Sequence, residues 1–404
     1  MSASLSGLKS PKPNPAWAKL PLFDRKGWKR MAFGDFAQSN GERAEPKDAQ
    51  EEIYVGLEHL DPQCLHIRRW GKGSDVIGGK LRFSKGDIIF GKRRAYQRKL
   101  AVAEFGGICS AHAMVIRAKP DLVLPDFLPF LMMSDRFMNR AVEISVGSLS
   151  PTINWTALKL ETFDLPPLDQ QRRIAEILWA ADEAVQAQST LEQSAVTLRM
   201  TLLRETFKDR RDYPTCRVAE AGDVQLGQQR HPKFQTGEGS RPYLRVANVM
   251  DDYFNCTDVL SMDFAEGELA KFALEPGDIL LNEGQSLELV GRCAMYDGAI
   301  RGCCFQKTLL RFRSLEEVNG EWALGYFQFC QHFGVFSSIS SQTTSVAHLT
   351  AVRFKALQFP RPPLSVQEEF SVQYRSIRKN LKELRRHGDN LKAVQTGLLN
   401  EWTK

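Results

Sequence analysis

Apolar residues recur every three or four positions in two long stretches of the chain, each beginning just after a Pro-Pro-Leu sequence. This is the period of an α-helix with one apolar face, and it predicts helices within residues 166–210 and 362–404. An apolar face that repeats about every 3.5 residues requires a partner helix to cover it, and each of the two stretches can supply the partner helix for the other. The predicted core of this helix pair consists of Ile174, Leu178, Ala181, Val185, Leu198, Phe370, Ile377, Leu381, Leu384 and Leu391. We therefore expect an antiparallel coiled coil that acts as a spacer.

The two stretches belong to a longer internal repeat. Residues 163–171 align without a gap with residues 359–367, and both segments carry Pro-Pro-Leu followed by a glutamine. Three further pairs of segments occur in the same order: residues 34–35 with 222–223, residues 54–60 with 243–249, and the Gly-Asp-Ile sequences at 86–88 and 277–279. The chain is therefore predicted to be an internal duplication.

Short apolar runs bounded by Gly, Asp and Pro surround these paired segments, as is typical of β-strands. The predicted fold class is α+β, with two pseudo-repeated globular domains separated by the two long helices. The predicted segments are an N-terminal arm (1–27), a first domain (28–165), a first spacer helix (166–210), a second domain (211–361) and a second spacer helix (362–404).

Composition narrows the class of protein. A chain of 404 residues with 43% hydrophobic and 25% charged residues is expected to be globular and to form at least two domains. The eight cysteines include no Cys-x-x-Cys pair, so we predict reduced thiols and no metal site. The N-terminal residues lack the apolar core of a signal peptide, and no apolar run reaches the length of a membrane span. These features predict a soluble, cytoplasmic protein.

The duplicated order of globular unit, Gly-Asp-Ile strand, Pro-Pro-Leu with its glutamine, and long helix resembles the specificity subunit of type I restriction-modification systems. The resemblance covers about residues 28–404, and residues 54–60 and 243–249 correspond to the opening strand of each target recognition domain. One departure is that the usual Glu-Gln after Pro-Pro-Leu reads Gln170-Gln171 in the first copy and Val366-Gln367 in the second.

The resemblance implies a DNA-binding subunit without catalytic residues. The sequence contains no Asn-Pro-Pro-Tyr loop, no glycine-rich turn for a methyl donor and no phosphate-binding loop, which agrees with that implication. The expected partners are double-stranded DNA, two methyltransferase (M) subunits and restriction (R) subunits. S-adenosylmethionine, ATP and Mg are expected in those partner subunits, and no cofactor is expected in this chain.

Basic and amide side chains supply the candidates for DNA contact. In the first domain they form two clusters, Arg68, Arg69 and Lys72, and Lys92, Arg93, Arg94, Tyr96, Arg98 and Lys99. Such cations neutralise phosphates, and an arginine that reaches a base edge can pair with guanine. In the second domain the candidates are Gln228, Gln229, Arg230, His231, Lys233, Gln285 and Ser286, because Gln can pair with adenine.

Two alternative interpretations do not require recognition of a DNA sequence. The basic residues can form an ordinary solvated loop. The chain can also be a coiled-coil scaffold that docks acidic proteins and does not recognise DNA sequence. Exchange of one domain for that of a relative would separate these interpretations, because only a specificity subunit would exchange half of its target.

Overall fold

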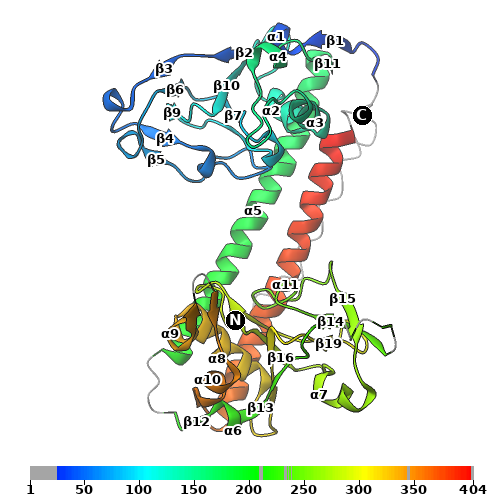
Figure 1. Cartoon of the computed structure of the whole chain (residues 1–404). Coiled ribbons are helices and arrows are strands. Elements are labelled where there is room, and N and C mark those ends of the chain that lie inside the picture. The colour runs from blue at the N-terminus through cyan, green and yellow to red at the C-terminus, as the bar shows by residue number, and fades with distance from the viewer. Residues whose placement is uncertain are drawn as a thin grey trace. The chain divides into compact units, whose positions relative to one another are not determined.

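The computed structural model describes residues 25–208, 213–231, 234, 236–237, 239–343 and 346–401. The chain forms two compact units, one of residues 1–187 with 388–404 and one of residues 188–387. Helices α5 (Leu168–Phe207) and α11 (Leu364–Glu401) each contribute one part to each unit (Figure 1). The predicted α+β class with two long helices is therefore confirmed, while the predicted domain boundaries stay a prediction. The predicted N-terminal arm lies outside the described residues except for residues 25–27.

Three β-sheets and a group of short helices make up the described part of the first unit together with its parts of α5 and α11. The strands are β1 (Lys29–Ala32), β2 (Ala37–Asn40), β3 (Arg43–Ala44), β4 (Ile53–Val55), β5 (Gly71–Lys72), β6 (Lys80–Phe83), β7 (Ile88–Gly91), β8 (Leu100–Val102), β9 (Gly107–Cys109), β10 (Ala113–Ala118) and β11 (Thr162–Leu165). The α-helices are α1 (Phe33–Phe36), α2 (Leu128–Met133), α3 (Asp135–Glu143) and α4 (Trp155–Leu158), and the short 3-10 helices are η2 (Pro46–Asp48), η3 (Leu57–His59), η4 (Gly73–Asp75) and η5 (Ala95–Gln97). The sheets have strand orders β2-β10-β7-β8 and β3-β6-β9-β4-β5, and β1 pairs separately with β11.

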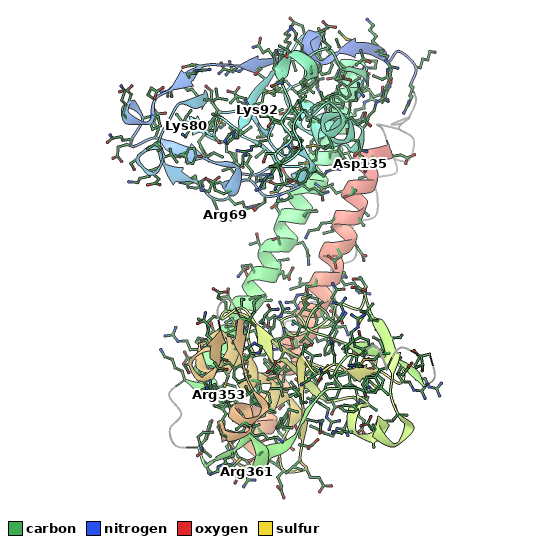
Figure 2. All side chains as sticks on the ribbon, viewed as in Figure 1. Arg69, Lys80, Lys92, Asp135, Arg353 and Arg361 are labelled. Carbon is green, nitrogen blue, oxygen red and sulfur yellow. The ribbon has the colours of Figure 1, made fainter. Side chains whose placement is uncertain are left out.

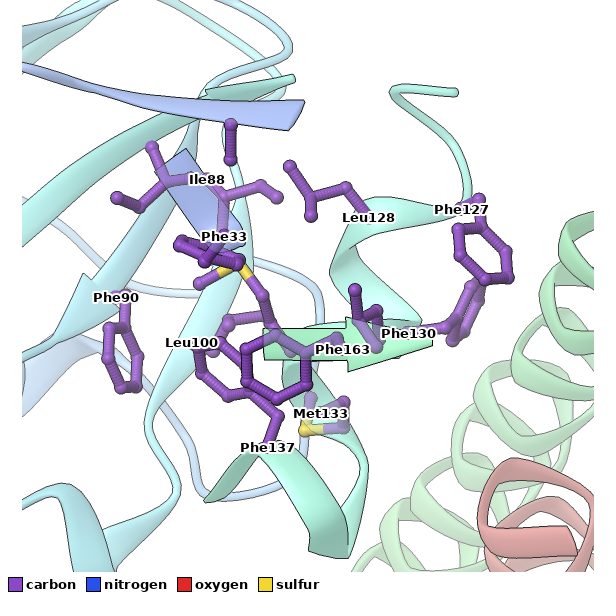
Figure 3. Packing of buried hydrophobic residues seen from close by; sticks show 14 of the residues in the cluster. Phe33, Ile88, Phe90, Leu100, Phe127, Leu128, Phe130, Met133, Phe137 and Phe163 are labelled. Carbon is purple, nitrogen blue, oxygen red and sulfur yellow. The ribbon is translucent and has the colours of Figure 1, made fainter. Parts of the chain in front are cut away.

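Phenylalanine side chains pack among aliphatic residues and methionines in the core of the first unit (Figure 3). Phe33, Phe137 and Phe163 are fully or almost fully buried, and their ring centroids lie 5.3 to 5.9 Å apart. Ile174 and Leu178 of α5 join the same cluster, together with Leu399 of α11. The helices are thus held to this unit by burial of apolar side chains. The sequence stripe predicted Ile174 and Leu178 for the core of the helix pair, whereas they pack in the core of the unit.

The second unit repeats this plan. Its strands are β12 (Thr215–Arg217), β13 (Gly222–Leu226), β14 (Ser240–Leu244), β15 (Leu260–Asp263), β16 (Ile279–Asn282), β17 (Gly284–Gln285), β18 (Cys293–Met295), β19 (Cys304–Phe305), β20 (Leu309–Ser314), β21 (Ser341–Thr343), β22 (Val346–His348) and β23 (Gln358–Pro360). Its helices are α6 (Val218–Ala221), η7 (Glu266–Glu268), α7 (Leu269–Phe272), α8 (Gly320–His332), α9 (Val335–Ile339) and α10 (Ala351–Ala356). The sheet β13-β20-β16-β18 repeats β2-β10-β7-β8, and the pair β12-β23 repeats β1-β11.

Strand pairing confirms two of the predicted repeat positions. Tyr54 lies opposite Ile108 in a parallel pair, and Tyr243 lies opposite Cys304 in the equivalent parallel pair. The Gly-Asp-Ile sequences begin β7 and β16, and both glycines have positive φ angles. The buried aspartate that follows binds an arginine on the neighbouring strand through two hydrogen bonds: Asp87 with Arg117 at 2.7 and 2.8 Å, and Asp278 with Arg313 at 2.6 and 2.8 Å.

The third predicted repeat position was wrong. Gly222 begins β13, whose counterpart β2 begins at Ala37, so Gly222 corresponds to Ala37 and not to Gly34. The equivalent of Asp35 is Glu220, because each carboxylate accepts a backbone N–H three residues earlier at the start of a short helix. A Gly-Asp pair is too common for its spacing to fix the alignment.

The repeated glutamine fastens each long helix to its own unit. Gln171 Nε2 donates to the backbone oxygens of Leu122 and Pro166, and its Oε1 accepts from the Leu124 N–H at 2.8 Å. Gln367 makes the same set of bonds: it donates to the backbone oxygens of Glu317 and Pro362 and accepts from the Asn319 N–H at 2.9 Å. Both side chains are buried. The glutamine is therefore required at this position in both copies because it completes the hydrogen bonding of a buried loop.

The predicted helix-pair core is mostly half-buried or buried, with one correction. Leu198 is 57% exposed, whereas its neighbour Arg199 is fully buried. Arg199 forms ion pairs with Asp251 and Asp252 inside the second unit, and the helix turns about 100° between successive residues. The face of α5 that carries Arg199 and Leu203 is therefore directed inward, and Leu198 is left outside it. In the described ranges, every helix is too short or too polar to cross a lipid bilayer.

Candidate nucleic-acid interface

A short loop after β7 pairs with a Ser-rich segment that lies more than fifty residues further along the chain. The Ile153 N–H donates to the Lys92 carbonyl at 2.9 Å, and the Arg94 N–H donates to the Pro151 carbonyl at 2.7 Å. Arg93 forms a β-bridge with Thr152 between these two bonds. We call residues 92–94 with 150–153 paired loop 1. The structure thus brings together a basic run and a hydroxyl-rich run that are distant in the sequence.

The second unit contains the same arrangement. The Leu349 N–H donates to the Glu283 carbonyl at 2.8 Å, and β17 pairs with β22 so that Gly284 lies opposite His348 and Gln285 opposite Ala347. We call residues 283–285 with 346–349 paired loop 2. The shared bonds make Lys92 equivalent to Glu283, and Thr152 equivalent to His348. Each unit therefore presents one paired loop built on the same strand, the one that follows its Gly-Asp-Ile sequence.

The basic residues of paired loop 1 differ in their partners. The side chain of Lys92 forms no hydrogen bond or ion pair with other described residues, and Figure 2 shows Lys92 on the sheet side of the first unit. Arg93 Nη1 lies 3.1 Å from His112 Nε2, and Arg94 Nη2 donates to Ser150 Oγ at 3.3 Å. Burial and the cations Arg93 and Lys92 lower the pKa of His112, so its ring is neutral near neutral pH and accepts from Arg93. Lys92 and Arg94 are therefore the cations best placed to meet a phosphate or a base.

Two other members of the predicted basic cluster have their donors bound within the unit, and contact of these two residues with DNA stays a prediction. Arg98 donates to Asp135 at 2.6 Å and to the Met133 carbonyl at 2.8 Å, and Lys99 Nζ donates to the Leu57 carbonyl at 2.6 Å. Satisfied donors of this kind hold η5 and β8 in place. Tyr96, between them, is 55% exposed and remains a candidate for contact with a base.

The cluster of Arg68, Arg69 and Lys72 lies on other elements. Arg68 donates to Gln186 of α5, Arg69 pairs with Asp61 at 2.5 Å, and Lys72 Nζ lies 3.6 Å from Glu51. The side chains of Arg69 and Lys72 are more than half exposed. Exposed pairs of this kind are weak, so both cations remain open to phosphate.

The candidates of the second unit divide in the same way. Gln228 is buried and donates to the Asp263 carbonyl at 3.0 Å, so its amide is directed into the unit, and its contact with DNA stays a prediction. Gln229 is exposed and accepts from Lys307 at 3.3 Å, and Arg230 and His231 are exposed. Lys233 lies outside the described residues. Gln285 belongs to paired loop 2 and Ser286 follows it, with both half-buried.

Sequence reasoning missed His348 as a member of the site, whereas Glu283 belongs to the segment 283–286 that the sequence offers as a reading loop. Their side chains lie 3.4 Å apart and are 22% and 40% exposed. An alignment of the hydroxyl-rich residues 145–152 with residues 341–348, which precede α4 and α10, would have found His348, because His348 then lies opposite Thr152. The cysteines add no chemistry here: burial raises the pKa of Cys109 and Cys303 to about 12, so both stay protonated thiols.

Comparison with known proteins agrees with this duplicated architecture. Residues 25–194 match the family model described as the type I restriction modification DNA specificity domain. The EcoDI specificity subunit of Escherichia coli is 29% identical over 194 residues, which are 45% of this chain and 41% of that protein. The EcoKI specificity subunit of Escherichia coli K12 is 24% identical over 308 residues, or 72% of this chain and 65% of that protein. The aligned parts thus span less than two thirds of these relatives.

A solved structure extends the likeness of the fold. The type I restriction-modification S subunit from M. genitalium has a TM-score of 0.59 to this chain, with 13% identity, and the alignment covers 93% of this chain and 96% of that one. At this identity the likeness concerns the fold alone. Taken with the family match over residues 25–194 and the curated relatives, it means that this chain is similar in sequence and in fold to type I restriction-modification specificity subunits.

Proposed function

We propose that the chain is the DNA sequence-recognition subunit of a type I restriction-modification complex. Each globular domain reads one half of a bipartite target, and the helix pair sets the gap between the halves. The observation that carries the proposal is the pair of equivalent loops: one backbone arrangement presents Lys92, Arg93 and Arg94 in the first unit and Glu283, Gly284 and Gln285 in the second. A repeated frame with different side chains is what reading two different half-sites requires.

The target is accordingly asymmetric, because hydrogen-bond donors and acceptors on the two loops select different base edges. The chain itself is non-catalytic in this proposal. Two methyltransferase subunits, which use S-adenosylmethionine, and restriction subunits, which use ATP and Mg, act on the DNA that it selects. The scaffold alternative gains no support, since it gives no reason for two copies of such a loop.

The test is single-molecule methylation sequencing of cells that carry this gene together with its neighbouring methyltransferase gene. Cells that lack only this gene are the control. The proposal expects methylated adenines in an asymmetric two-part motif that disappear on deletion. An unchanged set of methylated sites in cells with an active methyltransferase would refute it.

A further inference from the structure

Equivalent positions of the two paired loops carry opposite charges. The carbonyls of Lys92 and Glu283 accept the same backbone bond, from Ile153 and Leu349, and each of these donors is fully buried just before a short helix. The side chains of Lys92 and Glu283 therefore branch from equivalent backbone positions in the two units. One is a pure hydrogen-bond donor and the other, when ionised, a pure acceptor.

The carboxylate of Glu283 contacts a histidine on the other strand of paired loop 2. Its Oε2 lies 3.4 Å from Nδ1 of His348, and its backbone N–H donates to the Thr308 carbonyl at 3.0 Å. A Cβ atom at Gly284 would lie 3.1 Å from Cε1 of His348, closer than almost all real contacts of that atom. The glycine thus leaves room for the imidazole beside Glu283, and the pair stays partly exposed.

A carboxylate is unfavourable beside DNA unless a base offers it a donor, because phosphates repel it. In the major groove the donors are the exocyclic amino groups, N4 of cytosine and N6 of adenine. Guanine and thymine present only acceptors at the equivalent edge, which suit the ammonium of Lys92 instead.

We propose that Glu283, positioned by His348, accepts a hydrogen bond from the exocyclic amino group of one cytosine or adenine in the half-site read by the second unit. The inference rests on the proposed function, since it presupposes that paired loop 2 faces DNA. Glu283 is then a specificity determinant that excludes a keto base at that position. The competing explanation is that the pair with His348 only stabilises the contact between β17 and β22.

The experiment removes the amino group from the DNA and the charge from the protein, separately and together. The full-length chain in complex with its methyltransferase binds the duplex target, in which each adenine of the second half-site is replaced in turn by purine and each cytosine by 2-pyrimidinone. We expect the wild-type complex to lose affinity by about 10-fold or more at one position, since a hydrogen bond to a charged group is lost. Glu283→Gln should lose much less at that position and as much as wild type at the others.

Glu316→Gln is the matched control, because Glu316 is an exposed acidic residue of the same unit and outside both paired loops. It should keep the wild-type pattern at every position. The proposal is overturned if the wild-type complex tolerates loss of every amino group in the second half-site, or if Glu283→Gln shows the same losses as wild type. The wild-type measurement alone can refute the proposal, so the test remains valid even if the Glu283→Gln variant folds poorly. A wild-type complex that binds no bipartite target would instead remove the proposed function, and this inference with it.

Discussion

At the scale of single residues, the partners of a cation decide whether it is available to DNA. Arg98 and Lys99 come from the same basic run as Lys92, yet their donors are occupied by Asp135 and by backbone carbonyls. Lys92 has no such partner within the described residues. Net charge along the sequence therefore overstates the number of residues that can contact phosphate.

This difference gives a prediction for salt dependence. Lys92→Ala and Arg94→Ala should each weaken DNA binding at low salt and reduce the slope of log K against log salt by about one, because one counterion fewer is released. Fluorescence anisotropy titrations at several salt concentrations measure this slope. Lys47→Ala, which removes an exposed cation of η2 in the same unit, is the control and should have the same slope as wild type. Slopes equal to wild type in both test variants would show that paired loop 1 does not contact phosphate.

At the scale of elements, a few polar contacts hold each unit to its part of the long helices. The glutamine after Pro-Pro-Leu is one such contact in both units. In the first unit, a second contact joins His66 to Asp182 of α5, with Nε2 2.6 Å from Oδ2, and Gln395 of α11 donates to the same carboxylate at 3.1 Å. In the second unit, the buried Arg199 of α5 pairs with Asp251, a residue that follows β14.

Loss of the glutamine should destabilise the unit that contains it. Gln367→Ala leaves the Asn319 N–H and the Pro362 carbonyl without their partner in a buried place, which costs about 1 to 3 kcal/mol per unsatisfied group. Urea unfolding of the full-length chain measures the change in free energy. Gln373→Ala, on the exposed face of the same helix, should change it by less than about 0.5 kcal/mol. Equal effects of the two substitutions would contradict the assigned role.

The contact of His66 predicts a dependence of stability on pH. The hydrogen bond to Asp182 raises the pKa of His66 above 6.5 in the folded state, against the opposing effect of burial. Protonated His66 thus adds stability that is fully present below the pKa of the unfolded chain and is lost as pH rises through the raised folded pKa. Thermal unfolding between about pH 6 and pH 9 should show this loss in wild type and a smaller one in His66→Gln. A pH profile unchanged by the substitution would rule out the contact as its source.

At the scale of the whole molecule, the duplication predicts that the two halves of the target can be exchanged independently. Replacement of residues 28–165 by the corresponding domain of a relative should change one half of the methylated motif and leave the other half as it was. Methylation sequencing reads both halves in one experiment. The complementary replacement of residues 211–361 should change only the other half. Changes in both halves from one replacement would contradict the assignment of one half-site to each domain.

The sequence by itself determined the plan of this protein. The helical period of the two long stretches, the Pro-Pro-Leu sequences with their glutamine and the paired Gly-Asp-Ile strands depend on neighbours close in the chain, so they can be recognised there. Repetition made each signal stronger, since the same pattern occurred twice in the same order. Fold class, the two long helices and the family likeness all followed from these local patterns.

Only the tertiary structure decided which side chains make up the site. The pairing of residues 92–94 with 150–153 joins segments distant in sequence, and the equivalence of Lys92 and Glu283 is visible only through the backbone bonds they share. The inward direction of Arg199 in place of Leu198 likewise depends on carboxylates supplied by another element. Residue type reports what a side chain can bind, whereas its partner depends on contacts between distant parts of the chain, which no local pattern encodes.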